Sequence, residues 1–217
     1  MYKETFERVT HYFTSERYMG ELKAAKDEFF QRTGTVFEDE PTYESRMTAF
    51  LEWFLLERVL WDSGAPPVRL FSEMYGETCS EREQTYLRGL QRTCHSLFEY
   101  ASRLSEGCRV RDLFDGKLYE VTERRSYAGI QKADVLDARL VPVGEHFLFS
   151  DAMWIHPTDV RSFIMGEVKK RQGRDRSGFN ELLFDLAYMK LKSDRFRHLP
   201  VASVYEATLK ERARGEG

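Results

Sequence analysis

The sequence predicts an α+β fold with an N-terminal helical arm, a small five-stranded antiparallel β-barrel or curled sheet, and C-terminal helices. In residues 1–95 and 157–217, apolar residues recur every three or four positions, the period of an amphipathic helix. In residues 96–156 the apolar period is two, and Asp115-Gly116 separates two β-rich runs as a hairpin turn does. These ranges are the three predicted regions.

The N-terminal region begins with two predicted helices. Phe6, Val9 and Phe13 recur at helical spacing, and Thr14 or Ser15 can cap a second helix. Gly34 is the expected stop of that second helix, because glycine adopts the left-handed conformation that commonly ends helices.

The most hydrophobic stretch of the chain, Met47–Trp61, predicts a third helix, with Thr42 as its cap. Apolar residues cover most of its circumference and leave a thin polar strip around Glu52 and Glu57. A helix that is apolar almost all round is buried on several sides, so this one is expected to form the core of the region. In the alternative interpretation its aromatic side chains line a ligand pocket.

Two further helices complete the N-terminal region. Val68 to Met74 predicts a short helix that Gly76 ends. Ser80 and Glu83 have the spacing of a capping box, in which each side chain binds the other residue's backbone N–H, and they predict the start of the next helix.

Five short strands are expected in the central region. Leu97–Leu104, Cys108–Arg111 and Tyr119–Val121 each alternate apolar and polar residues, and so do Asp134–Val141 and Glu145–Phe149. Tight turns between short strands favour a small barrel of the SH3-like or a related kind. The Asp115-Gly116 turn is predicted to be type I′, which requires positive φ at both residues.

The C-terminal region predicts three helices. Val160 and Val168 mark the apolar face of the first, Phe179–Phe196 is an amphipathic helix, and Pro200 suits the first turn of the last helix. Lys169 to Gly178 is a charged, glycine-containing connection.

Composition excludes several functional classes. The chain has 217 residues, of which 32% are charged, yet its net charge is only −3, so it lacks the basic excess of a global nucleic-acid binder. No run of 18 apolar residues and no apolar N-terminal leader occurs, so no membrane association is expected. Three cysteines without a framework (Cys79, Cys94 and Cys108) favour a reducing compartment, and we expect a cytoplasmic location.

Charge is divided unevenly between the two helical regions. Residues 1–95 carry 12 Lys/Arg and 17 Asp/Glu, whereas residues 157–217 carry 13 Lys/Arg and 9 Asp/Glu. In one interpretation the basic C-terminal helices pack on the acidic N-terminal region within the fold. In the other, the basic helices face an acidic partner.

Motifs for enzymatic chemistry are almost absent. The sequence contains no phosphate-binding glycine loop, no nucleophile elbow and no H-E-x-x-H zinc motif, and its five histidines are scattered singly. We therefore expect no metal site and no cofactor. One exception is Glu167-x-Lys169 with Asp151 upstream, which resembles metal-dependent nucleases that hold Mg²⁺ on a strand bearing both carboxylate and lysine. The segment also fits a helix, in which Glu167 and Lys169 would diverge.

Two polar stretches are the candidate ligand- or partner-binding residues. The first is a connection in the β region whose arginines can clasp a phosphate or carboxylate beside a tyrosine, and the second is the densest basic run of the chain. They comprise Arg124, Arg125 and Tyr127, and Lys169, Lys170, Arg171, Arg174 and Arg176. Both stretches are also what a solvated loop and an exposed helix end would contain.

Three stretches resemble an uncharacterised bacterial family, some of whose members carry a cysteine-rich SEC-C zinc tail. The matching stretches are Phe50–Leu70, Phe98–Val121 with its Asp-Leu-Phe-Asp-Gly, and Asp134–Phe149 with its Ala-Arg-Leu-Val-Pro. The resemblance implies the same helical and barrel architecture and a bacterial origin. The zinc tail has no counterpart in this sequence, so the resemblance brings no metal site.

The sequence therefore predicts a non-enzymatic cytosolic binding or adaptor protein that contacts a protein partner. The first alternative is a nucleic-acid-binding protein that uses the basic residues named above. The third hypothesis is a Mg²⁺-dependent nuclease centred on Glu167 and Lys169. Oligomeric state is left open.

Overall fold

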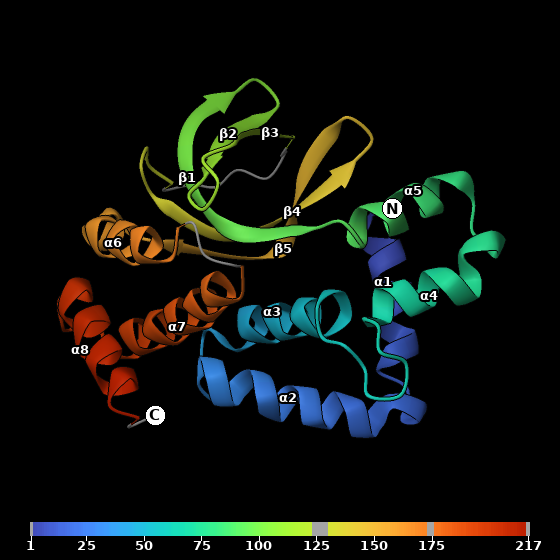
Figure 1. Cartoon of the computed structure of the whole chain (residues 1–217), viewed down its shortest axis with the longest axis horizontal. Helices are drawn as coiled ribbons and strands as arrows, with labels where there is room; N and C mark the ends of the chain where they lie inside the picture. The colour runs from blue at the N-terminus through green and yellow to red at the C-terminus, as the bar shows by residue number, and fades with distance from the viewer. Residues whose placement is uncertain (1, 123–129, 173–175, 216–217) are drawn as a thin grey trace. The chain divides into compact units, whose positions relative to one another are not determined.

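The computed structural model describes residues 2–122, 130–172 and 176–215, and it confirms the predicted α+β fold (Figure 1). The N-terminal helices are α1 (Tyr2–Phe13), α2 (Met19–Thr33), α3 (Tyr43–Leu56), α4 (Pro67–Tyr75) and α5 (Glu81–Leu90), with short 3-10 turns at Glu16–Tyr18 and Gly76–Thr78. The strands are β1 (Cys94–Leu104), β2 (Gly107–Asp112), β3 (Leu118–Thr122), β4 (Val135–Val143) and β5 (His146–His156). After a 3-10 turn at Thr158–Val160 come α6 (Arg161–Arg171), α7 (Arg176–Arg195) and α8 (Val201–Ala213).

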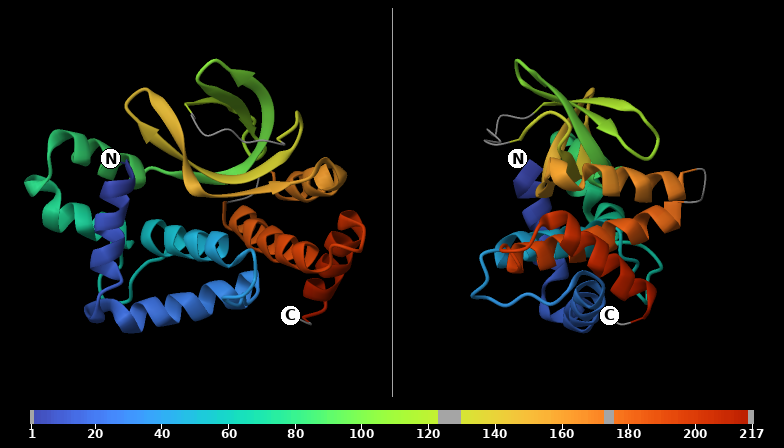
Figure 2. Two further views of the ribbon diagram at one scale, coloured as in Figure 1. Left: turned by 180° about the vertical axis from the view of Figure 1, so that it is seen from behind. Right: turned by 90° about the vertical axis from the view of Figure 1, so that its left-hand side faces the viewer.

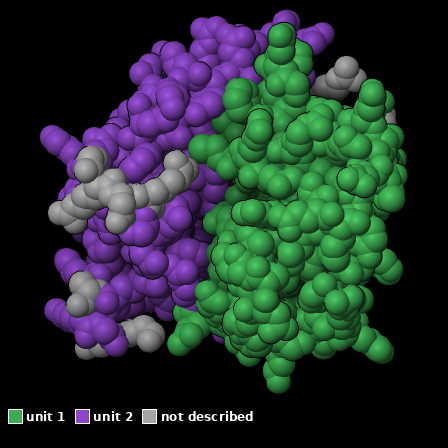
Figure 3. Space-filling model, turned by 45° about the vertical axis from the view of Figure 1, so that its right-hand side comes forward, with its two compact units in different colours: residues 1–31, 36–94, 139–152 green, residues 32–35, 95–138, 153–217 purple. Residues whose placement is uncertain are grey.

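The chain divides into two compact units, which Figure 3 shows in different colours. Unit 1 comprises residues 1–31, 36–94 and 139–152, and unit 2 comprises residues 32–35, 95–138 and 153–217. Each unit has its own buried core. The division into three regions at residues 95 and 156 stays a prediction.

Helix α3 forms the core of unit 1, as predicted, but it ends at Leu56 and not at Trp61. Its Phe50 and Phe54 are fully buried. The helix stops because Arg58 leaves the helical path: its guanidinium binds the carboxylates of Glu21 (2.6 Å) and Glu28 (3.1 Å). The predicted end at Trp61 was wrong because the carboxylates that bind Arg58 belong to α2, and the sequence of α3 alone does not show them.

Glu52 and Glu57 do not form an exposed polar strip on α3. Glu52 is buried, with 3% of its surface exposed, and it accepts a hydrogen bond from the backbone N–H of Ala152 at 2.9 Å. The guanidinium of Arg139, from β4, lies 3.5 Å from Glu52 and also binds Glu57. β4 therefore lies against the polar face of α3, and its buried Arg139 compensates the negative charges of Glu52 and Glu57.

The predicted helix ends at Ser80 and Gly34 are confirmed, but the predicted caps Ser15 and Thr42 make no side-chain capping hydrogen bond. Ser80 and Glu83 form the capping box at the start of α5. Gly34 follows α2 with a φ of +87°, the left-handed conformation that ends the helix. At Gly89 in α5, an added Cβ would lie 2.2 Å from the carbonyl oxygen of Pro142, so this close approach requires glycine.

The five strands form a closed barrel in the order β1-β2-β3-β5-β4. β2 pairs antiparallel with β1, with Phe98 opposite Asp112, and the pairing shifts at a β-bulge between Tyr100 and Ser102. The prediction left a closed barrel and an open curled sheet as alternatives. The structure has the closed form.

The hairpin between β2 and β3 is longer than predicted and is not a two-residue type I′ turn. β2 ends at Asp112 and β3 begins at Leu118, and only Gly116 of the turn has positive φ, at +77°. The tip widens because its two hydrophobic residues turn into the core: Leu113 is 5% exposed, and the Phe114 ring lies 4.7 Å from that of Phe179 in α7.

The core of unit 2 lies where α6, α7 and α8 meet residues of β1, the β2–β3 loop and the start of β4. α7 and α8 pack side by side (Figure 2). The buried residues are Leu97, Leu113, Val135, Val160, Ile164, Val168, Phe179, Leu182, Leu183, Leu186, Met189 and Tyr205. One polar pair lies among them: the hydroxyl of Tyr205 is 2.8 Å from Nδ1 of the fully buried His156.

Candidate functional site

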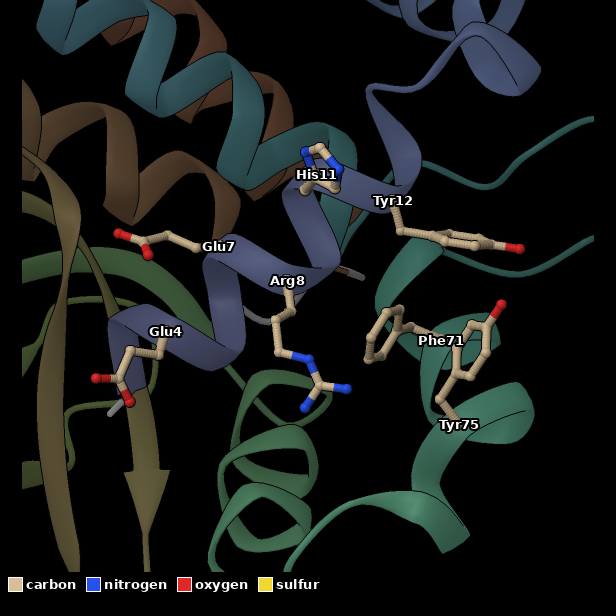
Figure 4. A pocket seen from close by; sticks show the side chains of 7 residues that line it. All are labelled: Glu4, Glu7, Arg8, His11, Tyr12, Phe71 and Tyr75. Atoms are coloured by element: carbon tan, nitrogen blue, oxygen red, sulfur yellow. The ribbon is translucent and has the colours of Figure 1, made fainter.

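An open groove of about 560 Å³ in unit 1 runs along α1 and faces α4 (Figure 4). We call it the α1–α4 groove. Its lining residues are Glu4, Glu7, Arg8, His11, Tyr12, Phe71 and Tyr75. Five of them belong to α1 and two to α4, so two helices of one unit build the site.

Helical spacing places these side chains in the groove. Glu4, Arg8 and Tyr12 follow one another at intervals of four along α1, and residues at this spacing share a helix face. Val9 and Phe13, also four apart, are fully buried and hold the other face of α1 in the core. α1 is therefore anchored by its apolar side and presents the groove residues to solvent.

Three aromatic rings form one end of the groove. The Tyr12 centroid lies 6.0 Å from that of Phe71 and 5.4 Å from that of Tyr75, with nearly perpendicular ring planes. Phe71 and Tyr75 are 5.1 Å apart. Phe71 is buried and supports the other two rings, which are partly exposed. Edge-to-face packing fixes their orientation, so this aromatic end is preorganised.

The tyrosine hydroxyls at this end are linked. The hydrogen bond with Tyr75 lowers the pKa of Tyr12, while the same bond raises the pKa of Tyr75. The Tyr12 oxygen also lies 3.9 Å from the sulfur of Met74, which is 44% exposed. The aromatic end thus offers apolar ring surface together with polar atoms at its edge.

Arg8 lies between the aromatic and acidic ends of the groove. Its guanidinium lies 5.8 Å from the centroid of Phe71 and forms an ion pair with Glu83. Glu83 is held by the capping box of α5, and its hydrogen bonds from the Ser80 backbone and hydroxyl, together with Arg8, lower its pKa. A cation, an aromatic ring and a carboxylate therefore already meet at this point.

The other end of the groove is acidic. Figure 4 shows the carboxylates of Glu4 and Glu7 on the side of α1 away from the three rings. Glu7 is exposed and makes no ion pair with any residue of the described ranges. Glu7 and His11 also line a second hollow of about 400 Å³, together with residues of α3. An exposed carboxylate beside two hollows is available to a cation from another molecule.

The predicted partner-binding residues lie elsewhere. Arg124, Arg125, Tyr127 and Arg174 fall outside the described residues. Arg176 is the first residue of α7, and its side chain is not among those described. Their assignment stays a prediction.

Lys169, Lys170 and Arg171 form the last turn of α6. Lys170 and Arg171 both bind the buried carboxylate of Glu167, Arg171 at 2.7 Å. Burial acts to raise the pKa of Glu167, but the hydrogen bonds from Lys170 and Arg171 outweigh it, and the pKa is lowered. Two of the three cations therefore neutralise a carboxylate of their own helix.

The strand arrangement required by the nuclease hypothesis is not formed at Glu167. Because Glu167 and Lys169 lie two positions apart on an α-helix, their side chains point about 200° apart around its axis. Asp151, the proposed second carboxylate, pairs with Lys3 at 3.2 Å. Within the described ranges, no group of three or more His, Cys, Asp or Glu side chains has a geometry that could hold a metal ion.

The α1–α4 groove is absent from the sequence-based predictions. The sequence predicted the short helix that contains Phe71 but not a groove beside it, and Tyr12 and Tyr75 were not among the candidate residues. The available signal was the polar and aromatic face of α1, Glu4, Arg8 and Tyr12, opposite an apolar face. Joining that face to α4 requires knowledge of the tertiary fold.

Comparison with protein families matches residues 6–182 to the Family of unknown function (DUF7986). The chain belongs to this family. The DUF7986 match contains residues 6–13 of α1, without Glu4, and the whole of α4, the two helices that line the groove. It confirms the prediction of an uncharacterised family. No curated protein and no solved structure matches the chain.

None of the helices in the described ranges is both long enough and apolar enough to cross a membrane.

Proposed function

We propose that this protein is a non-enzymatic binding or adaptor protein that holds a peptide segment of a partner protein in the α1–α4 groove. The supporting observation is the groove itself: a preorganised aromatic end, a fixed arginine and an exposed carboxylate along one helix. Tyrosine and arginine are enriched at protein interfaces, because they combine large contact area with hydrogen bonding.

The size of the groove favours a short segment as its occupant. Its volume of about 560 Å³ lies within the usual range for sites that take small ligands, and the groove is open along α1. An extended peptide fits such a shape, since its side chains can enter the hollow while its backbone stays near the surface.

The proposal includes a bacterial cytoplasm as the setting. The bacterial origin rests on the resemblance at Phe50–Leu70, Phe98–Val121 and Asp134–Phe149. The cytoplasmic setting is supported by the cysteines, since none of Cys79, Cys94 and Cys108 takes part in a disulfide.

The test is site-specific photo-crosslinking in cells of the source organism. The photoreactive residue benzoylphenylalanine is placed at Tyr75 in the groove or, as a matched control, at Tyr43 at the start of α3. We expect one protein to cross-link at Tyr75 and not at Tyr43. The purified partner should then bind the wild-type chain and lose at least about tenfold in affinity to Tyr75→Ala, the loss typical of an interface tyrosine.

The control for folding is the Tyr43→Ala variant, which should bind the partner as tightly as the wild type does. Cross-links that are the same at both positions, or a partner whose affinity Tyr75→Ala leaves unchanged, would exclude the groove as the docking site.

A further inference from the structure

We infer that the α1–α4 groove recognises an extended segment in which an arginine or lysine lies two to four residues from an apolar anchor residue. This inference rests on the proposed function and specifies its ligand. The apolar anchor lies on the rings of Tyr12, Phe71 and Tyr75, and the cationic side chain reaches Glu7 at the acidic end.

The spacing follows from the geometry of α1. Glu4 and Glu7 precede Tyr12 by eight and five residues, which at the helical rise corresponds to about 12 Å and about 7.5 Å. An extended peptide advances about 3.3 Å per residue, so these separations along the axis correspond to two to four peptide residues. Glu7 also lies about 140° around the helix axis from Tyr12, so the long side chain of the arginine or lysine reaches around α1 to meet the Glu7 carboxylate.

The apolar anchor follows from the aromatic end. Tyr12 and Tyr75 are partly exposed and their ring orientations are fixed by Phe71, so they lose little conformational freedom when a ligand covers them. Proline, leucine and valine side chains pack well on such surfaces. The hydroxyls of Tyr12 and Tyr75 are hydrogen-bonded to each other beside the rings, and the one proton not used between them can be donated to a peptide carbonyl group.

The cationic residue follows from the acidic end. Glu7 is exposed and makes no ion pair with the described part of the chain. The arginine of the lining, Arg8, is already paired with Glu83, which leaves the exposed carboxylate of Glu7 for a ligand. Charge complementarity therefore favours a cation over an anion at this end.

The protein already contains this mode of recognition within its own chain. The guanidinium of Arg8 lies over the ring of Phe71 at 5.8 Å and pairs with the carboxylate of Glu83. Arginine combines stacking on an aromatic face with hydrogen bonding to a carboxylate, which lysine does less well. Arg8 also repels a second cation from the middle of the groove. The ligand's cation is thereby directed to Glu7 and its apolar residue to the rings.

The test begins with a displayed library of random dodecapeptides, panned on the wild-type protein and counter-selected on the Tyr75→Ala variant. We expect the retained peptides to carry Arg or Lys two to four residues from a proline, aliphatic or aromatic residue. The most enriched peptide is then synthesised with its Arg or Lys intact, changed to Gln, and changed to Glu. Binding is measured by fluorescence anisotropy.

A double-mutant cycle identifies the cation's partner. Glu7→Gln and the peptide change to Gln should each weaken binding by about fivefold, the upper range for an exposed ion pair, and together by no more than either alone. The Glu7→Lys variant should bind the Glu-substituted peptide better than the original one. Asp27→Lys, at an exposed position of α2, is the matched control and should leave both affinities unchanged.

The outcomes separate the inference from the proposed function. Peptides that depend on Tyr75 but lack a cation, or whose cation is indifferent to Glu7→Gln, would overturn the inference and leave the groove as a docking site. A library that yields no Tyr75-dependent peptide, while Tyr75 still cross-links a partner in cells, also overturns the inference alone. Loss of both results removes the proposed function as well.

Discussion

Two buried polar groups, one in each unit, are kept in different charge states. In unit 1, Arg139 is 3% exposed and lies between the carboxylates of Glu52 and Glu57. In unit 2, His156 is fully buried against the Tyr205 hydroxyl, and burial is the main reason that its pKa falls to about 4. Arg139 stays charged and paired in unit 1, whereas His156 stays neutral in unit 2, which also buries the paired carboxylate of Glu167.

The cost of burying an ionisable side chain is therefore met in two ways, and the two have different consequences for stability. A buried ion pair costs desolvation of both charges, and it tolerates the loss of neither partner. A buried neutral histidine avoids that cost near neutral pH but introduces a dependence on acid. The stability of unit 1 should therefore respond most to mutation at Arg139, and that of unit 2 to pH.

The largest expected effect comes from removing the arginine of unit 1. Arg139→Met leaves the buried carboxylate of Glu52 without its cation, and we expect a loss of about 3 to 5 kcal/mol in the free energy of unfolding. Urea denaturation at neutral pH measures it. The matched control is the triple variant Arg139→Met, Glu52→Gln, Glu57→Gln, which removes all three charges and should recover most of the loss. A single variant as stable as the wild type would show that this interior does not depend on charge pairing.

The second effect is the acid response of unit 2. The His156 imidazole takes up a proton near pH 6.5 in the unfolded chain but only near pH 4 in the fold. Its neutral form is therefore fully favourable to folding above pH 6.5, and we expect the free energy of unfolding to fall by about 3 kcal/mol as the pH drops from 6.5 to 4. Asp137 and Asp194 oppose the lowered pKa, and Lys190 reinforces it.

Denaturation curves recorded across this pH range test the assignment. His156→Phe should be less stable at neutral pH, because the Tyr205 hydroxyl loses its partner, yet it should lose most of the slope. His146→Gln, at an exposed position in β5, is the control and should keep the slope. If the slope survives in His156→Phe, another group carries the acid response.

The smallest change in the free energy of unfolding is expected at an exposed polar contact. It serves as the reference for the changes at the two buried sites. Ser80→Ala removes the hydroxyl that accepts the Glu83 backbone N–H, and the cap should cost about 1 kcal/mol. Thermal unfolding measures the change, with Ser45→Ala in α3 as a comparison, since that hydroxyl binds a backbone carbonyl without capping a helix. A cost at Ser80 equal to that at Arg139 would show that burial is not what distinguishes the sites.

Some local features of the fold were predictable from the sequence, and features made by distant residues were not. The capping box at Ser80 and the stop at Gly34 involve neighbouring residues, so the pattern contains the needed information. The end of α3 depends on Glu21, and the wide tip of the β2–β3 hairpin depends on Phe179. Neither partner can be identified before the chain is folded.

The candidate site followed the same rule. Basic runs are visible in a sequence because their residues are contiguous. For this reason the basic residues from Lys169 to Arg176 were predicted to bind a ligand or partner. The structure shows that Lys170 and Arg171 neutralise Glu167 within one helix turn. The groove draws Tyr12 and Tyr75 from helices more than fifty residues apart along the chain, so no linear motif marks it.

The closed barrel limits how this protein can associate with other chains. An open sheet ends in strands whose free N–H and C=O groups can pair with an added strand, which serves recognition but also promotes fibrous aggregation. In the order β1-β2-β3-β5-β4 the last strand returns to the first, so the barrel has no strand at an edge. Partners of the barrel must therefore bind through side chains and not by adding a strand to the sheet. Concentrated solutions of the protein should also resist aggregation by strand addition while the barrel stays folded.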